Sequence, residues 1–328
     1  MPRARAVVIT ESGGPEVLSL GETDVRDPGP HELLVRVHAA GLNRADTLQR
    51  RGFYPAPKGA PADVPGLEYA GTVEATGRAV SRFSVGDEVM GIAAGGAMAT
   101  HLVTHEREAI PVPDDMDLTV AGGVPEVWLT AYDALFRQAQ VGLGSRVLIH
   151  AVASGVGTAA VQLVKHAGGV ALGTSRSAAK LERMAALGLD HGIHTTKGEF
   201  AATVRDAVGG VDVILDTVGG AYLGENVAAL APGGTMVVIG LMGGVKGELP
   251  LGVLLGKRLS IIGSVLRARP LEEKAALSQA FTRAVLPSLT DGTLRPVIDT
   301  VMPMSEVAEA HRRMDANETF GKIVLTWE

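Results

Sequence analysis

Short runs of alternating or apolar residues dominate the first third of the chain. They cover residues 5–10, 17–21 and 32–39, and clusters rich in Pro, Gly and Asp, such as residues 27–30, separate them. A period of two residues is typical of half-buried strands, and such clusters are typical of turns. The pattern predicts a mostly β module over residues 1–122.

The pattern changes near residue 125, where strand-like and helix-like runs begin to alternate. Strands are expected at 146–150, 170–174, 211–216, 235–240 and 259–265, and helices at 127–139, 158–167, 178–187 and 225–230. Such alternation implies parallel strands joined by right-handed crossovers. We therefore predict an α/β fold with a Rossmann-type doubly wound parallel sheet over 123–265. The tail, 266–328, has helices expected at 272–289 and 303–316 and a strand at 322–326, and should return to the β module.

Composition narrows the function classes. A chain of 328 residues with 46% hydrophobic and 20% charged residues is expected to form two folded domains. A net charge of −6 gives no basic face for nucleic acid. No apolar stretch is long enough to span a membrane, and the run at 6–9 is too short for a signal peptide, so we expect a cytoplasmic protein. Without cysteine the chain has no disulfide, no thiol nucleophile and no thiolate ligand for zinc.

A loop of small residues follows the first strand of the alternating series. It contains Ser154, Gly155, Val156 and Gly157 and opens a helix. Small residues allow the backbone to approach a pyrophosphate, and a helix N-terminus offers free N–H groups to it. A plain strand-to-helix turn would use similar residues, but the position at the first βα unit favours dinucleotide binding.

The end of the second strand indicates which dinucleotide the fold prefers. Folds that prefer NAD place an acidic residue about twenty positions after the loop. This chain has Ser175 and Arg176 there instead, followed by Lys180. Two basic side chains suit the 2′-phosphate of NADPH. The alternative is a pair of solvated charges at a helix start.

Several motifs in a fixed order resemble one enzyme family. They are GLNRAD at 41–46, PGLEYAG at 65–71, PEVWLTA at 125–131, SGVGTAA at 154–160, LMGG at 241–244, SVLRAR at 264–269, Asn317, and GKIVL at 321–325. Together they resemble the zinc-free quinone oxidoreductases of the medium-chain dehydrogenase/reductase superfamily, over essentially the whole chain. The branch induced by a tumour suppressor in animals is the most similar.

The resemblance implies a GroES-like catalytic domain split around the nucleotide domain, with the active site in the cleft between them. Zinc-dependent members have Cys where Asn43 stands and His where Leu67 stands. We therefore expect no metal site and no Lewis acid to polarise an alcohol.

By the same resemblance, Asn43, Asp46 and Tyr54 would line the substrate pocket. Each has a structural alternative: Asn43 as a turn residue, Asp46 as a helix cap and Tyr54 as loop packing.

The resemblance also implies cofactor contacts outside the loop of small residues. The nicotinamide would be flanked by Gly240, Leu241, Met242, Ser264 and Leu266, and Asn317 would reach the cofactor from the tail. Relatives often have a Tyr near Thr195 that contacts the adenosine phosphate. Its absence shifts phosphate anchoring towards Arg176 and Lys180.

These observations predict an NADPH-dependent oxidoreductase that transfers hydride to quinones or related electron-poor acceptors. The cofactor supplies the chemistry, and the protein supplies alignment and exclusion of water. Two alternatives stay open: a reductase of enones or enoyl thioesters, and a cofactor-binding structural or sensor protein with little turnover. The apolar run at 259–265 could pair with its own copy, which predicts a homodimer.

Overall fold

The structure, a computed structural model that describes residues 3–327, divides into two compact units. Residues 1–129 with 266–328 form one, named here the split unit, and residues 130–265 form the other, the parallel-sheet unit. The first boundary lies after residue 129, whereas the sequence placed it after 122. Gly122 packs so closely on strand β3 (Glu32–Gly41) that a Cβ there would lie 2.6 Å from Ala39 Cβ, so this segment stays with the split unit. Helix α3 (Pro125–Tyr132) runs across the boundary.

The parallel-sheet unit contains six parallel strands in the order β10-β9-β8-β11-β12-β13. Their bounds are β8 (Arg146–Ile149), β9 (Val170–Ser175), β10 (His191–His194), β11 (Val211–Asp216), β12 (Leu230–Val238) and β13 (Ser260–Gly263). Numbered from β8, the order is 3-2-1-4-5-6, the doubly wound arrangement, with its switch point between β8 and β11. This confirms the predicted α/β fold class.

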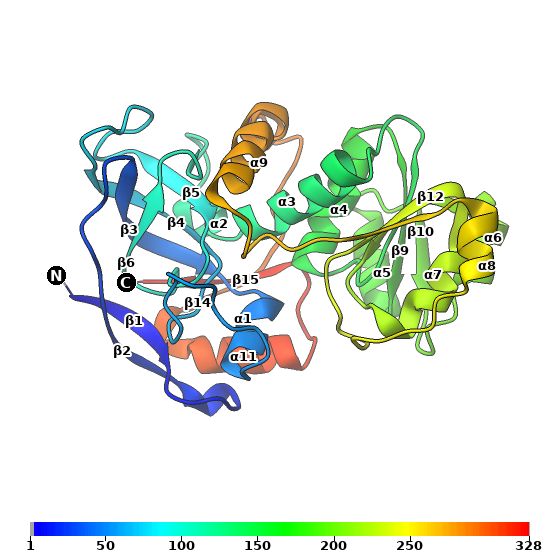
Figure 1. Cartoon of the computed structure of the whole chain (residues 1–328), viewed down its shortest axis with the longest axis horizontal. Coiled ribbons are helices and arrows are strands. Elements are labelled where there is room, and N and C mark those ends of the chain that lie inside the picture. The colour runs from blue at the N-terminus through cyan, green and yellow to red at the C-terminus, as the bar shows by residue number, and fades with distance from the viewer. Residues whose placement is uncertain (1–2, 328) are drawn as a thin grey trace. The chain divides into compact units, whose positions relative to one another are not determined.

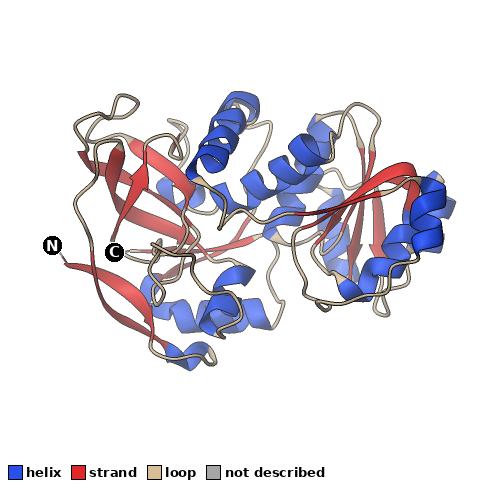
Figure 2. Ribbon diagram, in the orientation of Figure 1, coloured by secondary structure: helices blue, strands red, loops and turns tan. Residues whose placement is uncertain are grey.

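Helices flank this sheet, as Figure 2 shows. They are α4 (Gly155–His166), α5 (Ala178–Ala185), α6 (Ala201–Val208), α7 (Leu223–Ala229) and α8 (Leu251–Lys257). Leu148, Ile214 and Met236 of the sheet are fully buried in one hydrophobic cluster. A sheet covered by helices explains why its central strands read as continuous apolar runs.

The split unit is mostly β (Figure 1). A two-stranded sheet pairs β1 (Arg3–Ile9) with β2 (Leu18–Asp24), and a seven-stranded sheet has the order β14-β15-β3-β4-β5-β7, with β6 pairing β3. The bounds are β3 (Glu32–Gly41), β4 (Glu68–Thr76), β5 (Glu88–Ile92), β6 (His101–His105), β7 (Ile110–Pro111), β14 (Ile298–Pro303) and β15 (Lys322–Thr326). Because β15 pairs antiparallel with β3, the tail rejoins the N-terminal sheet.

Further α-helices lie wholly within the split unit. They are α1 (Arg44–Arg50), α2 (Leu118–Ala121), α9 (Leu271–Ala284), α10 (Leu286–Thr290) and α11 (Val307–Asp315). The single helix expected over 272–289 is broken at Val285, because Pro287 cannot donate to the helix ladder and its ring obstructs the preceding turn. No helix within residues 3–327 has the length and apolar character needed to cross a bilayer.

Candidate functional site

The loop after β8 has the form expected of a dinucleotide loop. Ser154 is the N-cap of α4, and its Oγ accepts a hydrogen bond from the N–H of Gly157 at 3.1 Å. The N–H groups of Gly155 and Val156 lie in the first helical turn, where no carbonyl of the same helix can reach them. They therefore face outward at the carboxyl edge of the sheet, beside its switch point, where an anion is stabilised.

Two glycines allow the backbone to close around this loop. A Cβ on Gly157 would lie 2.2 Å from the carbonyl oxygen of Val152, and a Cβ on Gly173 would lie 2.5 Å from Val152 Cγ2. Such contacts are too short for any side chain, so the loop at Val152 can pack against α4 and β9 only because both positions are glycine. The residues present fit the pyrophosphate of a nicotinamide dinucleotide.

The end of β9 is polar and basic. Ser175 ends the strand, Arg176 is exposed, and Lys180 lies in the first turn of α5, where its N–H donates to Ser177 Oγ at 3.3 Å. Within residues 3–327 no ion pair involves Arg176. The nearby Thr195 is buried, and its Oγ1 accepts the N–H of Gly198 at 3.0 Å, so it stabilises a turn.

The segments expected near the nicotinamide fall in both units. Gly240 follows β12, and the next two side chains, Leu241 and Met242, are half exposed at 50% and 51%. Ser264 is fixed through its Oγ, which accepts from Gln138 Nε2 at 2.8 Å.

Leu266 and Asn317 belong to the split unit. Leu266 is buried, whereas Asn317 has a left-handed φ of 58° and its Oδ1 accepts from Arg44 Nη2 at 2.8 Å.

Asn43, the first predicted substrate residue, lies in a buried polar network of the split unit. Its Nδ2 donates to the carbonyl of Gly41 at 3.2 Å and to Glu68 Oε1 at 2.9 Å, while its Oδ1 accepts from Lys322 Nζ at 2.8 Å. An amide NH₂ has two hydrogens. Both are therefore engaged within the protein, which leaves Asn43 without a donor for an acceptor molecule.

Glu68 and Lys322 form the ion pair at the centre of this network, 2.6 Å apart and almost fully buried. Lys322 Nζ also donates to the carbonyl of Leu42 at 2.8 Å, and Glu68 Oε2 accepts the N–H of Glu126 at 2.8 Å. Gly41 leaves room for the carboxylate, since a Cβ there would lie 2.2 Å from Glu68 Oε1. Removing one member of such a pair typically costs about 3–5 kcal/mol.

Asp46, the second predicted residue, is fully buried. Its two oxygens accept the N–H groups of Asn43 at 2.8 Å and Gly66 at 3.0 Å. Burial raises its pKa to about 6, and the two N–H donors offset part of that effect. Asp46 joins the start of α1 to the loop at Gly66, and bulk solvent does not reach it.

Tyr54, the third, is partly exposed. The Arg267 guanidinium lies 5.1 Å from the centre of its ring and donates to its carbonyl at 3.0 Å. Burial raises the pKa of the Tyr54 phenol, so its hydroxyl stays protonated at neutral pH. Arg267 is held in turn by Gln49 Oε1 and the carbonyl of Ala94, both at 2.7 Å.

Sequence reasoning assigned no role to Glu68, Glu126, Arg267 or Lys322. All four lie inside the motifs that identified the family. The sequence therefore contained these positions, but it did not show that the four side chains lie in one part of the fold. Glu126 is partly exposed at the start of α3. Burial, and then the nearby charge of Glu68, raise the pKa of Glu126 to about 8. Within residues 3–327 there is no cluster of His, Asp or Glu able to hold a metal ion.

Comparisons with known proteins agree with this fold. The family model "Alcohol dehydrogenase GroES-like domain" matches residues 29–114, and "Zinc-binding dehydrogenase" matches residues 155–282. These matches define a medium-chain dehydrogenase/reductase, with a GroES-like domain and a dinucleotide-binding domain.

Comparisons with individual proteins narrow the class of oxidoreductase. Human quinone oxidoreductase is 32% identical over 98% of this chain and 97% of its own length. A 2-haloacrylate reductase of a Burkholderia species is 32% identical over 98% of both chains. The structure of a quinone oxidoreductase from Pseudomonas syringae pv. Tomato DC3000 superposes with a TM-score of 0.88 at 31% identity, covering 98% of this chain and 99% of that one. The chain belongs to the zinc-free quinone oxidoreductase family of the medium-chain dehydrogenase/reductases, as its motifs predicted. It is an oxidoreductase of a superfamily that binds a nicotinamide cofactor.

Proposed function

We propose that this protein reduces quinones with NADPH. The observation that carries the proposal is the β9 end, where the exposed Arg176 and the nearby Lys180 stand in place of a carboxylate, beside a glycine-walled phosphate loop. A guanidinium can bind a 2′-phosphate through two hydrogen bonds, and no acidic side chain at that strand end repels it. The relatives named quinone oxidoreductase support the choice of acceptor.

In this proposal the bound nicotinamide supplies the hydride, and the protein's residues bind the acceptor and stabilise the charge that develops on it. Asn43 has both amide hydrogens engaged, so the oxyanion donor is the Tyr54 hydroxyl. Asp46 and the Glu68–Lys322 pair hold the surrounding backbone in place. A hydrogen bond preorganised at the position of the developing charge lowers the barrier without reorganisation during the reaction.

Arg176→Gln tests the choice of NADPH. We expect the Kd of NADPH to rise about 10- to 100-fold, because a charge-assisted hydrogen bond contributes about 1.5–3 kcal/mol. The Kd of NADH should stay within about twofold, since NADH lacks the phosphate. Arg183→Gln, which removes a charge from the last turn of α5, the helix that follows Arg176, is the matched control. Equal losses for both cofactors in a fluorescence titration would contradict the assignment.

A second candidate function is reduction of electron-poor alkenes. The similarity to a protein named 2-haloacrylate reductase favours it, because such a substrate carries an activated carbon–carbon double bond. Rates of NADPH oxidation with benzoquinones, naphthoquinones and enones at equal concentration distinguish the two. The quinone proposal expects the highest kcat/KM with a quinone, and a higher value with the enone would replace it.

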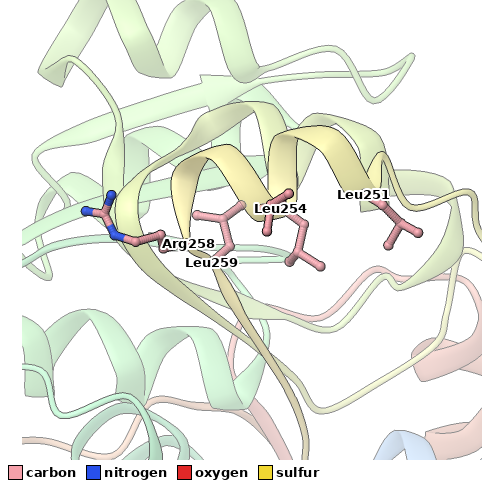
Figure 3. Close-up of a pocket in the computed structure, with 5 residues that line it drawn as sticks. Leu251, Leu254, Arg258 and Leu259 are labelled. Atoms are coloured by element: carbon pink, nitrogen blue, oxygen red, sulfur yellow. The ribbon is translucent and has the colours of Figure 1, made fainter.

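We further propose that two copies associate through β13. This strand is the last of its sheet, and within residues 3–327 nothing pairs with its outer edge. Ile261 on it is 38% exposed, Val265 beyond it is 47% exposed, and Leu255 of the preceding helix α8 is 80% exposed. Figure 3 shows the neighbouring apolar pocket with Leu251, Leu254, Arg258 and Leu259 at its wall. An unpaired apolar edge is self-complementary and can continue the sheet into a second copy.

A further inference from the structure

Reduction by hydride leaves a proton to be supplied. Converting a quinone to a hydroquinone adds one hydride and one proton, and an alkene receives hydride on one carbon and a proton on the next. The donor must be a protonated group that a bound acceptor can touch. These two criteria distinguish the acidic groups around Tyr54.

Three carboxyl groups lie in this part of the split unit, and two of them are inaccessible to solvent. Asp46 and Glu68 are fully buried. Both carboxyls are fully engaged, Asp46 by two backbone N–H groups and Glu68 by Lys322, Asn43 and the N–H of Glu126. Neither can reach a molecule outside the protein.

Glu126 differs from them in both respects. It is partly exposed, and within residues 3–327 no hydrogen bond or ion pair to its carboxyl group is found. Its backbone N–H is fixed on Glu68 Oε2, which holds the residue beside an existing negative charge. The carboxyl also lies close enough to Tyr54 for its charge to raise the pKa of the Tyr54 phenol.

Charged groups from several elements act on the Glu126 carboxyl. Glu68 of β4 and Asp46 of α1 disfavour the ionised carboxylate, whereas Lys322 of β15 and Arg267 favour it. The helix dipole at the start of α3 also favours the ionised carboxylate. Burial and Glu68 outweigh these effects and raise the pKa of Glu126 to about 8.

We propose that Glu126 is the proton donor of the reduction: its carboxylic acid protonates the anion formed when hydride reaches the acceptor, while the Tyr54 hydroxyl holds the same oxygen. The O–H bond of Glu126 breaks, the new bond to oxygen or carbon forms, and the carboxylate takes a proton from water before the next turnover. This role rests on the proposed function.

Glu126→Gln tests the role, because it keeps the size of the side chain and the backbone N–H to Glu68. General acid catalysis is worth about 10²–10⁴-fold, so we expect kcat to fall by about 100-fold or more with an enone. The loss should be smaller with a chlorinated benzoquinone, whose reduced anion is less basic. NADPH affinity and Tm should match those of Glu273→Gln, an exposed control on α9.

The pH dependence gives a readout that a structural role would not move. A donor must be protonated, so wild-type kcat should decline above pH about 8. Glu126→Gln should lack that decline, and Glu126→Asp should restore part of it. In the cofactor-free protein, the infrared band of a protonated carboxyl should disappear as the pH rises through about 8, and should be missing from Glu126→Gln.

The outcomes separate this proposal from the proposed function. If the wild type turns over and Glu126→Gln keeps both its rate and its decline above pH about 8, the role of Glu126 as proton donor is overturned, and the proposed function is not. A carboxyl band that titrates near the ordinary value for glutamate would also overturn it. Failure of the wild type to oxidise NADPH with any quinone or enone would overturn the proposed function, and the proton donor with it.

Discussion

At the scale of single residues, burial separates the polar side chains near Tyr54 that stabilise the fold from those that can contact a substrate. Asn43 and Asp46 matched the family pattern, yet every donor of Asn43 is used internally and Asp46 is sealed. Tyr54 and Glu126 are themselves partly exposed. A side chain must both keep a free polar group and reach the surface to act on a substrate, and only the folded structure reveals this.

His150 in the parallel-sheet unit shows what a fully satisfied buried histidine does. Its Nε2 lies 2.6 Å from Asn226 Oδ1 and its Nδ1 lies 2.8 Å from Thr174 Oγ1. A neutral ring that donates from Nε2 to Asn226 Oδ1 and accepts at Nδ1 from the Thr174 hydroxyl satisfies both contacts. Burial lowers the pKa of His150 to about 4.

This arrangement predicts acid sensitivity. The unfolded chain binds a proton at His150 near pH 6.5 and the folded protein only near pH 4, so stability is complete above about 6.5 and declines as the pH falls between these values. Between pH 7.5 and 5 the wild type should lose about 2 kcal/mol more free energy of unfolding than His150→Gln. Urea unfolding at both pH values measures the difference. Equal losses in the two proteins would contradict the prediction.

At the scale of elements, the start of α4 is the most tightly determined part of the parallel-sheet unit. The Ser154 cap and the approach of Gly157 to Val152 fix the helix end at the carboxyl edge of the sheet. The sequence predicted this loop because both the small residues and their place after the first strand are local features. The break between α9 and α10 was missed, although Pro287 marks it.

Ser154→Arg should block this helix end. A long side chain in place of a small cap would fill the space in front of the Gly155 and Val156 N–H groups, so we expect the Kd of NADPH to rise at least about tenfold, or about 1.4 kcal/mol. Ser154→Ala is the control, because it removes the cap at a cost of about 1 kcal/mol in stability without adding bulk. Calorimetric titration measures both, and unchanged binding in Ser154→Arg would contradict the assignment of the loop.

At the scale of the whole molecule, the free edge of β13 predicts a dimer. Sedimentation equilibrium at micromolar concentration should give about twice the mass of one chain, and Ile261→Lys should shift it towards a single chain, because a charge on the edge opposes pairing. Val85→Lys, an exposed apolar position on the split unit, should leave the mass unchanged. A wild type with the mass of one chain would refute the dimer.

The sequence by itself determined the alternation of strands and helices, the loop of small residues that opens α4, the basic end of β9 and the family. Each of these depends on residues that are close in the chain, or on motifs read in order. The tertiary structure alone decided that Glu68 and Lys322 meet at Asn43 and that the backbone of Glu126 joins Glu68. Pairing of β15 with β3 joins residues about 280 positions apart. The tertiary structure also decided which of these polar side chains are buried, because burial depends on how elements pack together and is not encoded in the local sequence.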